Sequence, residues 1–465
     1  MAKSPLRTVF VCQQCGKESL RWFGRCPDCQ EWNSFAEKPQ DPPHKLQSHG
    51  SISGGEVTEL SEVTTEDKAR LLTPLDEFNR VLGGGIVPGS LVLVSGDPGI
   101  GKSTLLLQVS ALVAAQGHKV LYVSGEESLH QIKIRADRLK IEGKGLYLLS
   151  ETDLEIILRR MEDVMPTLTI IDSVQTVHLG EVGGVPGSIG QIRESTLRLM
   201  HWTKLNQIPT LITGHVTKEG AIAGPKVLEH MVDVVLYLEG DSFSAYRILR
   251  GIKNRFGSTN EIGVFEMRDQ GLMEVNDPSK VFLSSRSRGA IGSAVAPTLE
   301  GTRPLLVEIQ ALTTPTSFGQ PRRTANGVDF NRLLMIMAVL TKRMGLSLSN
   351  QDVIVNVAGG LRISEPAADL AVALSLASTL RDREVDPDLV AVGEVGLSGE
   401  VRPVSQIERR VNEAGRQGFT RCIVPSASQN NPKGQKGIEL IPVDSLREAL
   451  QAGMAPKPKN RNARQ

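Results

Sequence analysis

The clearest chemical signal in this chain is a glycine-rich run, G-D-P-G-I-G-K-S, at residues 96–103. It is the complete phosphate-binding pattern G-x4-G-K-S, with an apolar run before it and a helix-forming run after it. The glycines let backbone N–H groups surround the phosphates, the lysine reaches the β/γ oxygens, and the serine hydroxyl binds Mg²⁺. We therefore predict a site for ATP and Mg²⁺ formed by Gly96, Asp97, Pro98, Gly99, Ile100, Gly101, Lys102, Ser103 and Thr104.

Polar residues follow three further apolar runs. Glu126 and Glu127 come after "KVLYVSG", Asp172 ends "LTIID", and His215 ends "LITGH". Because the carboxyl ends of parallel strands face the ligand crevice, one of the two glutamates could hold and polarise the attacking water. Asp172 would support Mg²⁺ as a Walker B acid, and His215, followed by Lys218, would sense the γ-phosphate. The alternatives are helix caps for the acids and a plain polar strand end for the histidine.

Four of the five cysteines lie close together in the sequence, as Cys12, Cys15, Cys26 and Cys29. Their spacing, C-x2-C-x10-C-x2-C, places two thiolates on each of two turns and predicts a tetrahedral Zn²⁺ site. Three aromatic residues could supply a small core around the metal: Trp22, Phe23 and Trp32. Since four protein ligands close the coordination shell, we expect recognition of DNA or of a protein here and no hydrolysis. Unpaired thiols or a redox-active C-x2-C pair are the alternatives.

The scaffold for these residues is predicted to be α/β. Apolar runs alternate with helical stretches, and "SLVLVSG", "KVLYVSG", "LTIIDS" and "IPTLITG" are typical of central parallel strands covered on both faces. A second α/β region contains "PLLVEIQAL", "DVIVNVAG" and "RCIVPSA" as expected strands. The predicted parts are a zinc motif at 1–35, a linker at 36–60, an ATPase domain at 61–275, a further domain at 276–455 and a basic tail at 456–465.

Bulk properties limit the class of protein. The net charge is +1, so binding to nucleic acid would depend on local basic patches. No apolar run approaches the ~20 residues that a membrane helix needs, and the first residues lack a secretory pattern. We expect a cytoplasmic protein with no membrane partner.

The phosphate loop with its upstream segment "TPLDEFNRVLGGGIVPGS", the glutamate pair and "IID" resembles the RecA-type ATPases. With the cysteine motif and "KNRFG" at 253–257, the chain is most similar to the RadA (Sms) family of bacterial DNA repair proteins. This resemblance implies a DNA-dependent ATPase that acts in homologous recombination alongside the RecA recombinase. It also implies a DnaB-type homo-hexamer that moves on single-stranded DNA and promotes branch migration of branched recombination intermediates.

The region 276–455 is similar to the peptidase domain of Lon proteases. The position of the Lon nucleophilic serine is occupied by Ala367, and the position of its lysine falls near Glu408. Without a nucleophilic oxygen and an amine base a Ser–Lys mechanism has no parts, so we expect a peptidase-inactive scaffold for ring assembly. Its basic residues could line a DNA path or be solvated charges: Arg286, Arg322, Arg323, Lys342 and Arg343.

In DnaB-type rings a lysine and an arginine two residues apart reach into the neighbouring subunit's site, and Lys253 and Arg255 have that spacing. Strand alternation puts both on one face, with Asn254 on the other. The alternative is that both cations bind DNA. The glycine-containing stretch 181–195 is a candidate DNA-contacting loop or a plain surface loop. A KaiC-like regulatory ATPase and an ATP-dependent protease are the alternative functions.

Overall fold

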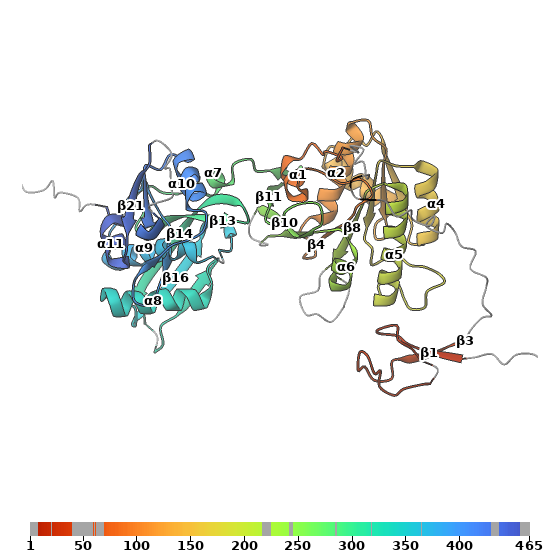
Figure 1. The fold of residues 1–465 in the computed structure, drawn as a ribbon, viewed down its shortest axis with the longest axis horizontal. Coiled ribbons are helices and arrows are strands. Elements are labelled where there is room, and N and C mark those ends of the chain that lie inside the picture. Colours follow the sequence, from red (N-terminus) through yellow and green to blue (C-terminus); the bar gives the residue numbers. More distant parts are fainter. Residues whose placement is uncertain are drawn as a thin grey trace, which may run out of the picture. The chain divides into compact units, whose positions relative to one another are not determined.

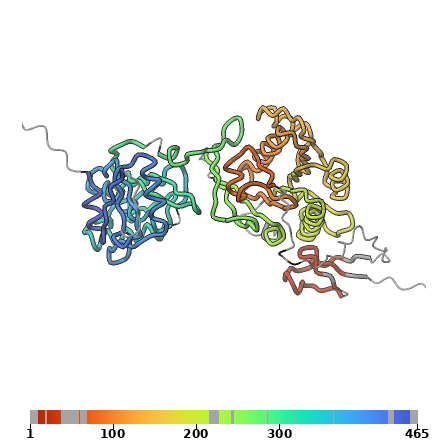
Figure 2. The backbone as a smooth tube through the Cα atoms, turned by 45° about the horizontal axis from the view of Figure 1, so that its top comes forward, coloured from red at the N-terminus to blue at the C-terminus, as the bar shows by residue number. Residues whose placement is uncertain are grey.

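The computed structural model describes residues 8–19, 21–39, 59, 61, 69–215, 225–240, 245–283, 286–317, 319–363, 365–428 and 437–455. The chain forms two compact units. The first comprises Met1–Glu239, Leu249–Thr259 and Arg268–Leu272, and the second Gly240–Ile248, Asn260–Met267 and Met273–Gln465. Figure 2, coloured along the chain, shows the residues coloured cyan to blue gathered in one body. No helix among the described residues is long and apolar enough to cross a membrane.

The cysteine-containing segment folds as a small antiparallel sheet in the order β2-β1-β3. Its strands are β1 (Thr8–Cys12), β2 (Glu18–Ser19) and β3 (Phe35–Pro39). The expected aromatic core is wrong, because Trp22, Phe23 and Trp32 are 52%, 42% and 68% exposed. The buried residues here are Cys12, Cys26 and Phe35. So small a sheet has little interior, and the cysteine centre takes the place of a core.

A nine-stranded sheet carries the phosphate loop, in the order β12-β11-β10-β9-β4-β8-β7-β5-β6. Figure 1 labels its strands β4, β8, β10 and β11. Strands β9 to β6 in this order are parallel neighbours. The four apolar runs of the sequence form adjacent, buried central strands, as predicted. The strands are β4 (Leu91–Gly96), β5 (Val120–Ser124), β6 (Leu146–Ser150), β7 (Leu168–Asp172), β8 (Thr210–His215), β9 (Val234–Glu239), β10 (Tyr246–Asn254), β11 (Ile262–Arg268) and β12 (Gly271–Glu274).

Helices cover both faces of the parallel part of this sheet. Odd-numbered residues of β4 and β5, such as Leu93 and Val123, pack in one cluster with Leu154, Leu199 and Leu228 of α4, α5 and α6. Strand alternation turns the intervening residues toward the other face, and α2 packs against β4 to β7. The helices are α1 (Asp76–Leu82), α2 (Lys102–Ala115), α3 (Leu129–Arg138), α4 (Leu154–Val164), α5 (Ile189–Asn206) and α6 (Pro225–Met231).

The second unit contains the mixed sheet β13-β14-β16-β15, the parallel sheet β17-β20-β21 and the short pair β18-β19. The predicted strands "PLLVEIQAL", "DVIVNVAG" and "RCIVPSA" lie in β14, β16 and β20. Helix α9 packs against β13 and β14, and its residues 369–378 are all buried. The strands are β13 (Ser293–Glu300), β14 (Arg303–Pro315), β15 (Arg323–Asn326), β16 (Gln351–Val357), β17 (Leu389–Ala391), β18 (Glu394–Val395), β19 (Val401–Arg402), β20 (Arg421–Pro425) and β21 (Glu439–Val443). The helices are α7 (Pro278–Leu283), α8 (Phe330–Met344), α9 (Asp369–Arg381), α10 (Ile407–Arg416) and α11 (Leu446–Gly453).

Candidate functional site

The phosphate loop joins the buried strand β4 to the N-terminus of α2. Gly96, Gly99 and Gly101 have φ values of 146°, 75° and 114°, in a region that L side chains rarely adopt. A Cβ at Gly96 would also lie 2.3 Å from the carbonyl oxygen of Leu238 in the neighbouring strand. The loop therefore needs glycine for its backbone path, and α2 begins at Lys102 with no side-chain cap on its first N–H groups. Uncapped N–H groups at a helix start are available to an anion.

Lys102 is 4% exposed and donates from Nζ to the carbonyl oxygens of Gly96 at 2.9 Å and Asp97 at 3.0 Å. Burial lowers the pKa of Lys102, while the carboxylates of Asp172, Asp97 and Glu126 act in the opposite direction. Among the described residues no carboxylate lies within salt-bridge distance of this ammonium group. Neutral carbonyl oxygens thus hold the ammonium group of Lys102. A phosphate oxygen can replace them as its hydrogen-bond partner at little cost in free energy.

The glutamate pair after β5 divides into two different environments. Glu126 is exposed, and its Oε1 accepts a hydrogen bond of 2.5 Å from the hydroxyl of Ser173. Glu127 instead forms an ion pair with Arg135 of α3, and its backbone N–H donates to Ser124 Oγ at 3.0 Å. Glu126 also lies close enough to Lys102 to act on its pKa. The geometry brings Glu126, and not Glu127, toward the phosphate loop.

Asp172 ends β7 with both carboxylate oxygens engaged. Oδ2 accepts from the Tyr122 hydroxyl at 2.6 Å, and Oδ1 accepts from the Thr213 hydroxyl at 2.7 Å. These bonds join β7 to its two neighbours β5 and β8 and fix the carboxylate beside Lys102. Burial, and then the negative charge of Asp172, raises the pKa of Tyr122 well above its ordinary value. The tyrosine therefore remains a donor, and the two hydrogen bonds fix the carboxylate of Asp172 in place.

His215 ends β8, and its backbone lies opposite Gly96 in the parallel register of β4 and β8. The side chain of His215 and the whole of Lys218 lie outside the described residues. The backbone of His215 thus lies next to Gly96, the first glycine of the phosphate loop.

Lys253 and Arg255 both contact the carboxyl end of α6 and the residues that directly follow it. Lys253 Nζ donates to the carbonyl oxygens of Glu229 at 2.8 Å and Val232 at 2.7 Å, at the carboxyl end of that helix. Arg255 Nη1 lies 3.2 Å from Asp233 Oδ1, and its side chain is 52% exposed. Strand β10, which ends at Asn254, is separated from β4 by β9, so these cations lie away from the phosphate loop of their own chain.

Asn254 points in the opposite direction, as strand alternation predicts. Its Nδ2 donates to the carbonyl oxygen of Leu82 at 3.2 Å, at the end of α1. Gly257 comes so close that a Cβ there would lie 3.1 Å from the Cα of Gly83. Arg70 donates to the carbonyl oxygen of Phe256 at 2.8 Å and completes this contact. The "KNRFG" segment is therefore seated by α1 on one side and by α6 on the other.

The stretch 181–195 is only partly a loop. Helix α5 begins at Ile189, so the expectation of a loop through residue 195 is wrong. Buried Gln191 in the first turn exchanges hydrogen bonds with the backbone of Leu179 at 2.9 and 3.1 Å. The glycines in this stretch made it look like a loop, so the start of α5 was missed. No local pattern indicates that Gln191 bonds to the backbone of Leu179 and anchors the helix.

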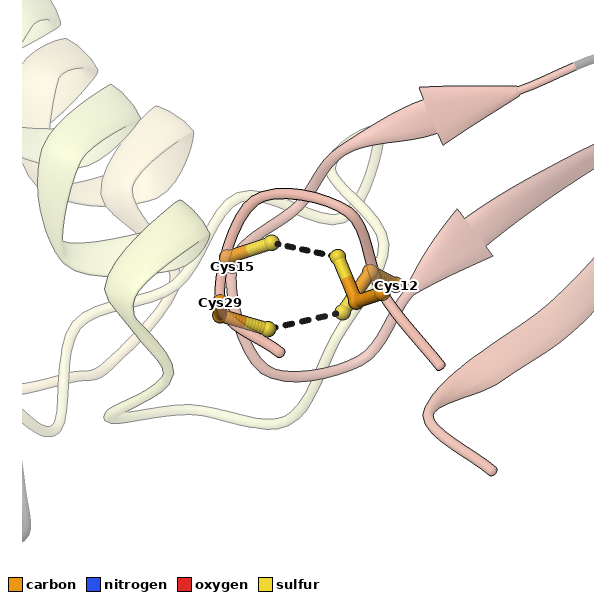
Figure 3. Close-up of side chains that lie close together, drawn as sticks. Cys12, Cys15 and Cys29 are labelled. Carbon is orange, nitrogen blue, oxygen red and sulfur yellow. Dashed lines mark hydrogen bonds between the residues drawn. The ribbon is translucent and has the colours of Figure 1, made fainter. Parts of the chain in front are cut away.

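The four predicted metal ligands converge. Their sulfur atoms all lie within 4.8 Å of one another, with Cys12 and Cys29 3.6 Å apart and Cys15 and Cys26 3.5 Å apart. Figure 3 shows the sulfur atoms of the labelled cysteines facing one another. Tetrahedral zinc with Zn–S bonds near 2.3 Å requires sulfur separations of about 3.8 Å. The four thiols fit Zn²⁺ and supply the complete ligand set of a structural site.

The positions that match the Lon dyad hold no peptidase chemistry. Ala367 is buried in an apolar cluster with Val295, Leu306 and Val390. Glu408 lies exposed in the first turn of α10. The described structure therefore places neither a nucleophile nor an amine at these two positions.

Comparisons with known proteins agree with this division. The family models that match are a rubredoxin metal binding domain at residues 10–37, an AAA domain at 57–221 and subunit ChlI of Mg-chelatase at 330–428. The curated relatives include the "DNA repair protein RadA" of Halalkalibacterium halodurans, 54% identical over 97% of this chain and 99% of the relative. The protein of the same name from Bacillus subtilis is 52% identical over 98% and 100%.

The fold and site define a RecA-like P-loop ATPase with a zinc ribbon before its ATPase core and a Lon-like α/β domain after it. It uses ATP and Mg²⁺, and its ribbon binds Zn²⁺. At this identity over nearly its whole length, the chain belongs to the DNA repair protein RadA family. It is therefore an ATP-hydrolysing enzyme of DNA repair.

Proposed function

We propose that this ATPase is a DNA-dependent motor that assembles as a DnaB-type homo-hexamer and moves on single-stranded DNA. In this role it promotes branch migration of branched recombination intermediates beside the RecA recombinase. The observation that carries the proposal is the placement of Arg255, which is half-exposed and lies two strands away from the phosphate loop of its own chain. A cation so placed suits a site completed by a second copy, in which hydrolysis depends on assembly.

Within one site we assign separate tasks to the polar residues. Lys102 binds the β/γ-phosphates, Ser103 and Asp172 hold Mg²⁺, and Glu126 positions the attacking water. Exposed Glu126 supports this last assignment, whereas the ion pair of Glu127 with Arg135 favours a structural role. His215 beside Gly96 is suited to sense the γ-phosphate.

The pair at the end of β10 divides in the same way. Arg255 is the group that acts on the neighbour's phosphoryl group, because much of its side chain is exposed. Lys253 already donates to backbone carbonyls of α6, so we assign it to holding the segment in place. Binding of both cations to DNA is the competing assignment.

The test is a mixing experiment with Arg255→Ala. The variant is expected to bind an ATP analogue nearly normally and to hydrolyse ATP slowly, with single-stranded DNA present. Mixed with wild-type protein at increasing ratios, it should lower activity more steeply than simple dilution, because each variant subunit inactivates a neighbouring site. Proportional dilution would contradict the trans-acting role, and an ATPase rate indifferent to DNA at low salt would contradict the motor.

The alternatives gain no support from the relatives, whose names refer to DNA repair. A KaiC-like ATPase would show no DNA-stimulated hydrolysis. An ATP-dependent protease would require a nucleophile where Ala367 stands.

A further inference from the structure

A buried carboxylate, Asp233, joins the phosphate-loop strand to Arg255. Asp233 directly precedes β9 and is 3% exposed. Its Oδ2 accepts a hydrogen bond of 3.1 Å from the backbone N–H of Leu91, the first residue of β4. Its Oδ1 lies 3.2 Å from Nη1 of Arg255. One side chain therefore connects the base of the phosphate-loop strand to the guanidinium group.

The main chain strengthens the same connection. The N–H of Asp233 donates to the carbonyl oxygen of Leu91 at 3.0 Å, and the N–H of Arg255 donates to the carbonyl oxygen of Asp233 at 3.2 Å. Arg255 is thus fixed to Asp233 through its backbone and its side chain. Ordering an arginine before its target arrives removes part of the entropy cost of binding.

The hydrogen bond between Asp233 and strand β4 does not require a negative charge on Asp233. The N–H of Leu91 needs only a neutral acceptor, and the carbonyl groups at the end of α6 already make this region negative. Lys253 offsets those carbonyls, and Lys204 Nζ lies 3.8 Å from Asp233 Oδ1 with a half-exposed side chain. A buried carboxylate is costly unless it is paired. Its shortest charged contact is with Arg255, which therefore accounts for the charge.

We propose that Asp233 is a positioning residue for Arg255, holding one edge of the guanidinium so that its other N–H groups face a phosphoryl group in the neighbouring subunit. This inference rests on the trans-acting role of Arg255 in the proposed function. Within the described part of the chain, the Arg255 side chain has its hydrogen bond with Asp233 alone, through Nη1. The remaining donors of the guanidinium are left for a ligand.

The experiment is a double-mutant cycle in the assembled full-length protein, measured as ATPase activity with single-stranded DNA. Asp233→Asn keeps an acceptor for Leu91 and removes the charge. We expect kcat to fall about tenfold, with KM and the Kd for an ATP analogue unchanged within about twofold. In an Arg255→Ala background, Asp233→Asn should cause no further loss, because the group it positions is absent. Lys204→Ala, which removes the other nearby cation, is the matched control and should retain wild-type kcat.

Two results would overturn the inference: an unchanged kcat in Asp233→Asn, or an equal loss with and without Arg255, which a purely structural role would give. Failure of the proposed function is distinguishable, because it appears as proportional dilution in the Arg255→Ala mixing experiment whatever Asp233→Asn does. If Asp233→Asn does not fold, Asp233→Glu is used in the same cycle. It keeps the charge, displaces it by one methylene and should show the same non-additivity.

Discussion

One buried cation in each of the two α/β regions of this protein shows two opposite ways of compensating charge. At the phosphate loop, Lys102 is buried against neutral carbonyls, although acids lie near it. In the Lon-like domain, Arg410 is fully buried, and both its terminal nitrogens pair with Glu365, at 2.7 and 2.6 Å. Arg410 also donates to the carbonyl oxygens of Pro297 and Ser405. A site that must receive a charged ligand leaves its charge incompletely compensated, whereas a scaffold pairs it completely.

The largest expected effect sharpens this contrast. Lys102→Ala should lower kcat/KM for ATP about 1,000-fold, because the cation that binds the β/γ-phosphates is lost. Stability in the absence of nucleotide should not fall, since the removed charge is one that burial disfavours. ATPase assays measure the loss of kcat/KM, and thermal unfolding measures the stability. A clear fall in melting temperature would contradict the expectation that the charge of Lys102 does not stabilise the fold.

In the Lon-like domain we expect the reverse, a loss of stability with no change in ATP binding. Arg410→Met should destabilise it by about 3 kcal/mol, because Glu365 keeps a charge without its partner. The double variant Arg410→Met, Glu365→Gln should recover much of this loss, as both charges are then gone. Urea unfolding measures the difference, and the Kd for an ATP analogue should stay unchanged in both variants. Equal stability of single and double variants would show that the pair is not what matters.

A smaller effect separates the two glutamates. Glu126→Gln should lower kcat about 100-fold with little change in ATP binding, since only the group that orients water is altered. Glu127→Gln is the matched control and should lower kcat only a few-fold, through loosening of its contact with Arg135. Steady-state ATPase kinetics with single-stranded DNA decide between them, and the opposite ranking would reverse the assignment.

The smallest expected effect concerns Ala367. Ala367→Ser places a hydroxyl in an apolar cluster and should cost about 1 kcal/mol in the free energy of unfolding. No casein degradation should appear in the presence of ATP, because Glu408 stands where an amine base is required. Peptidase activity in this variant would mean that the domain retains a base that the Lon comparison does not identify.

Local patterns in the sequence predicted the structural features that are formed by residues close together in the chain. The phosphate loop, the four cysteines and the central strands were all indicated by spacing or by continuous apolar runs. The carboxylate of Asp233 and the pair Arg410–Glu365 join residues tens of positions apart, so no local signal could identify their partners. Strand β6, which lies at the sheet edge and is only partly buried, was also missed, although its sequence LYLLS is as apolar as that of β7.

The hydrogen bond from Tyr122 to Asp172 also makes the nucleotide site optically observable. Because burial and the adjacent carboxylate raise the pKa of Tyr122, its stabilising contribution is intact below pH 10 and declines above it. In an alkaline absorbance titration, phenolate formation at Tyr122 should be delayed until the strands around it separate. Among the four tyrosines of the chain, Tyr122 is thus the one whose ionisation reports whether β5, β7 and β8 are still joined.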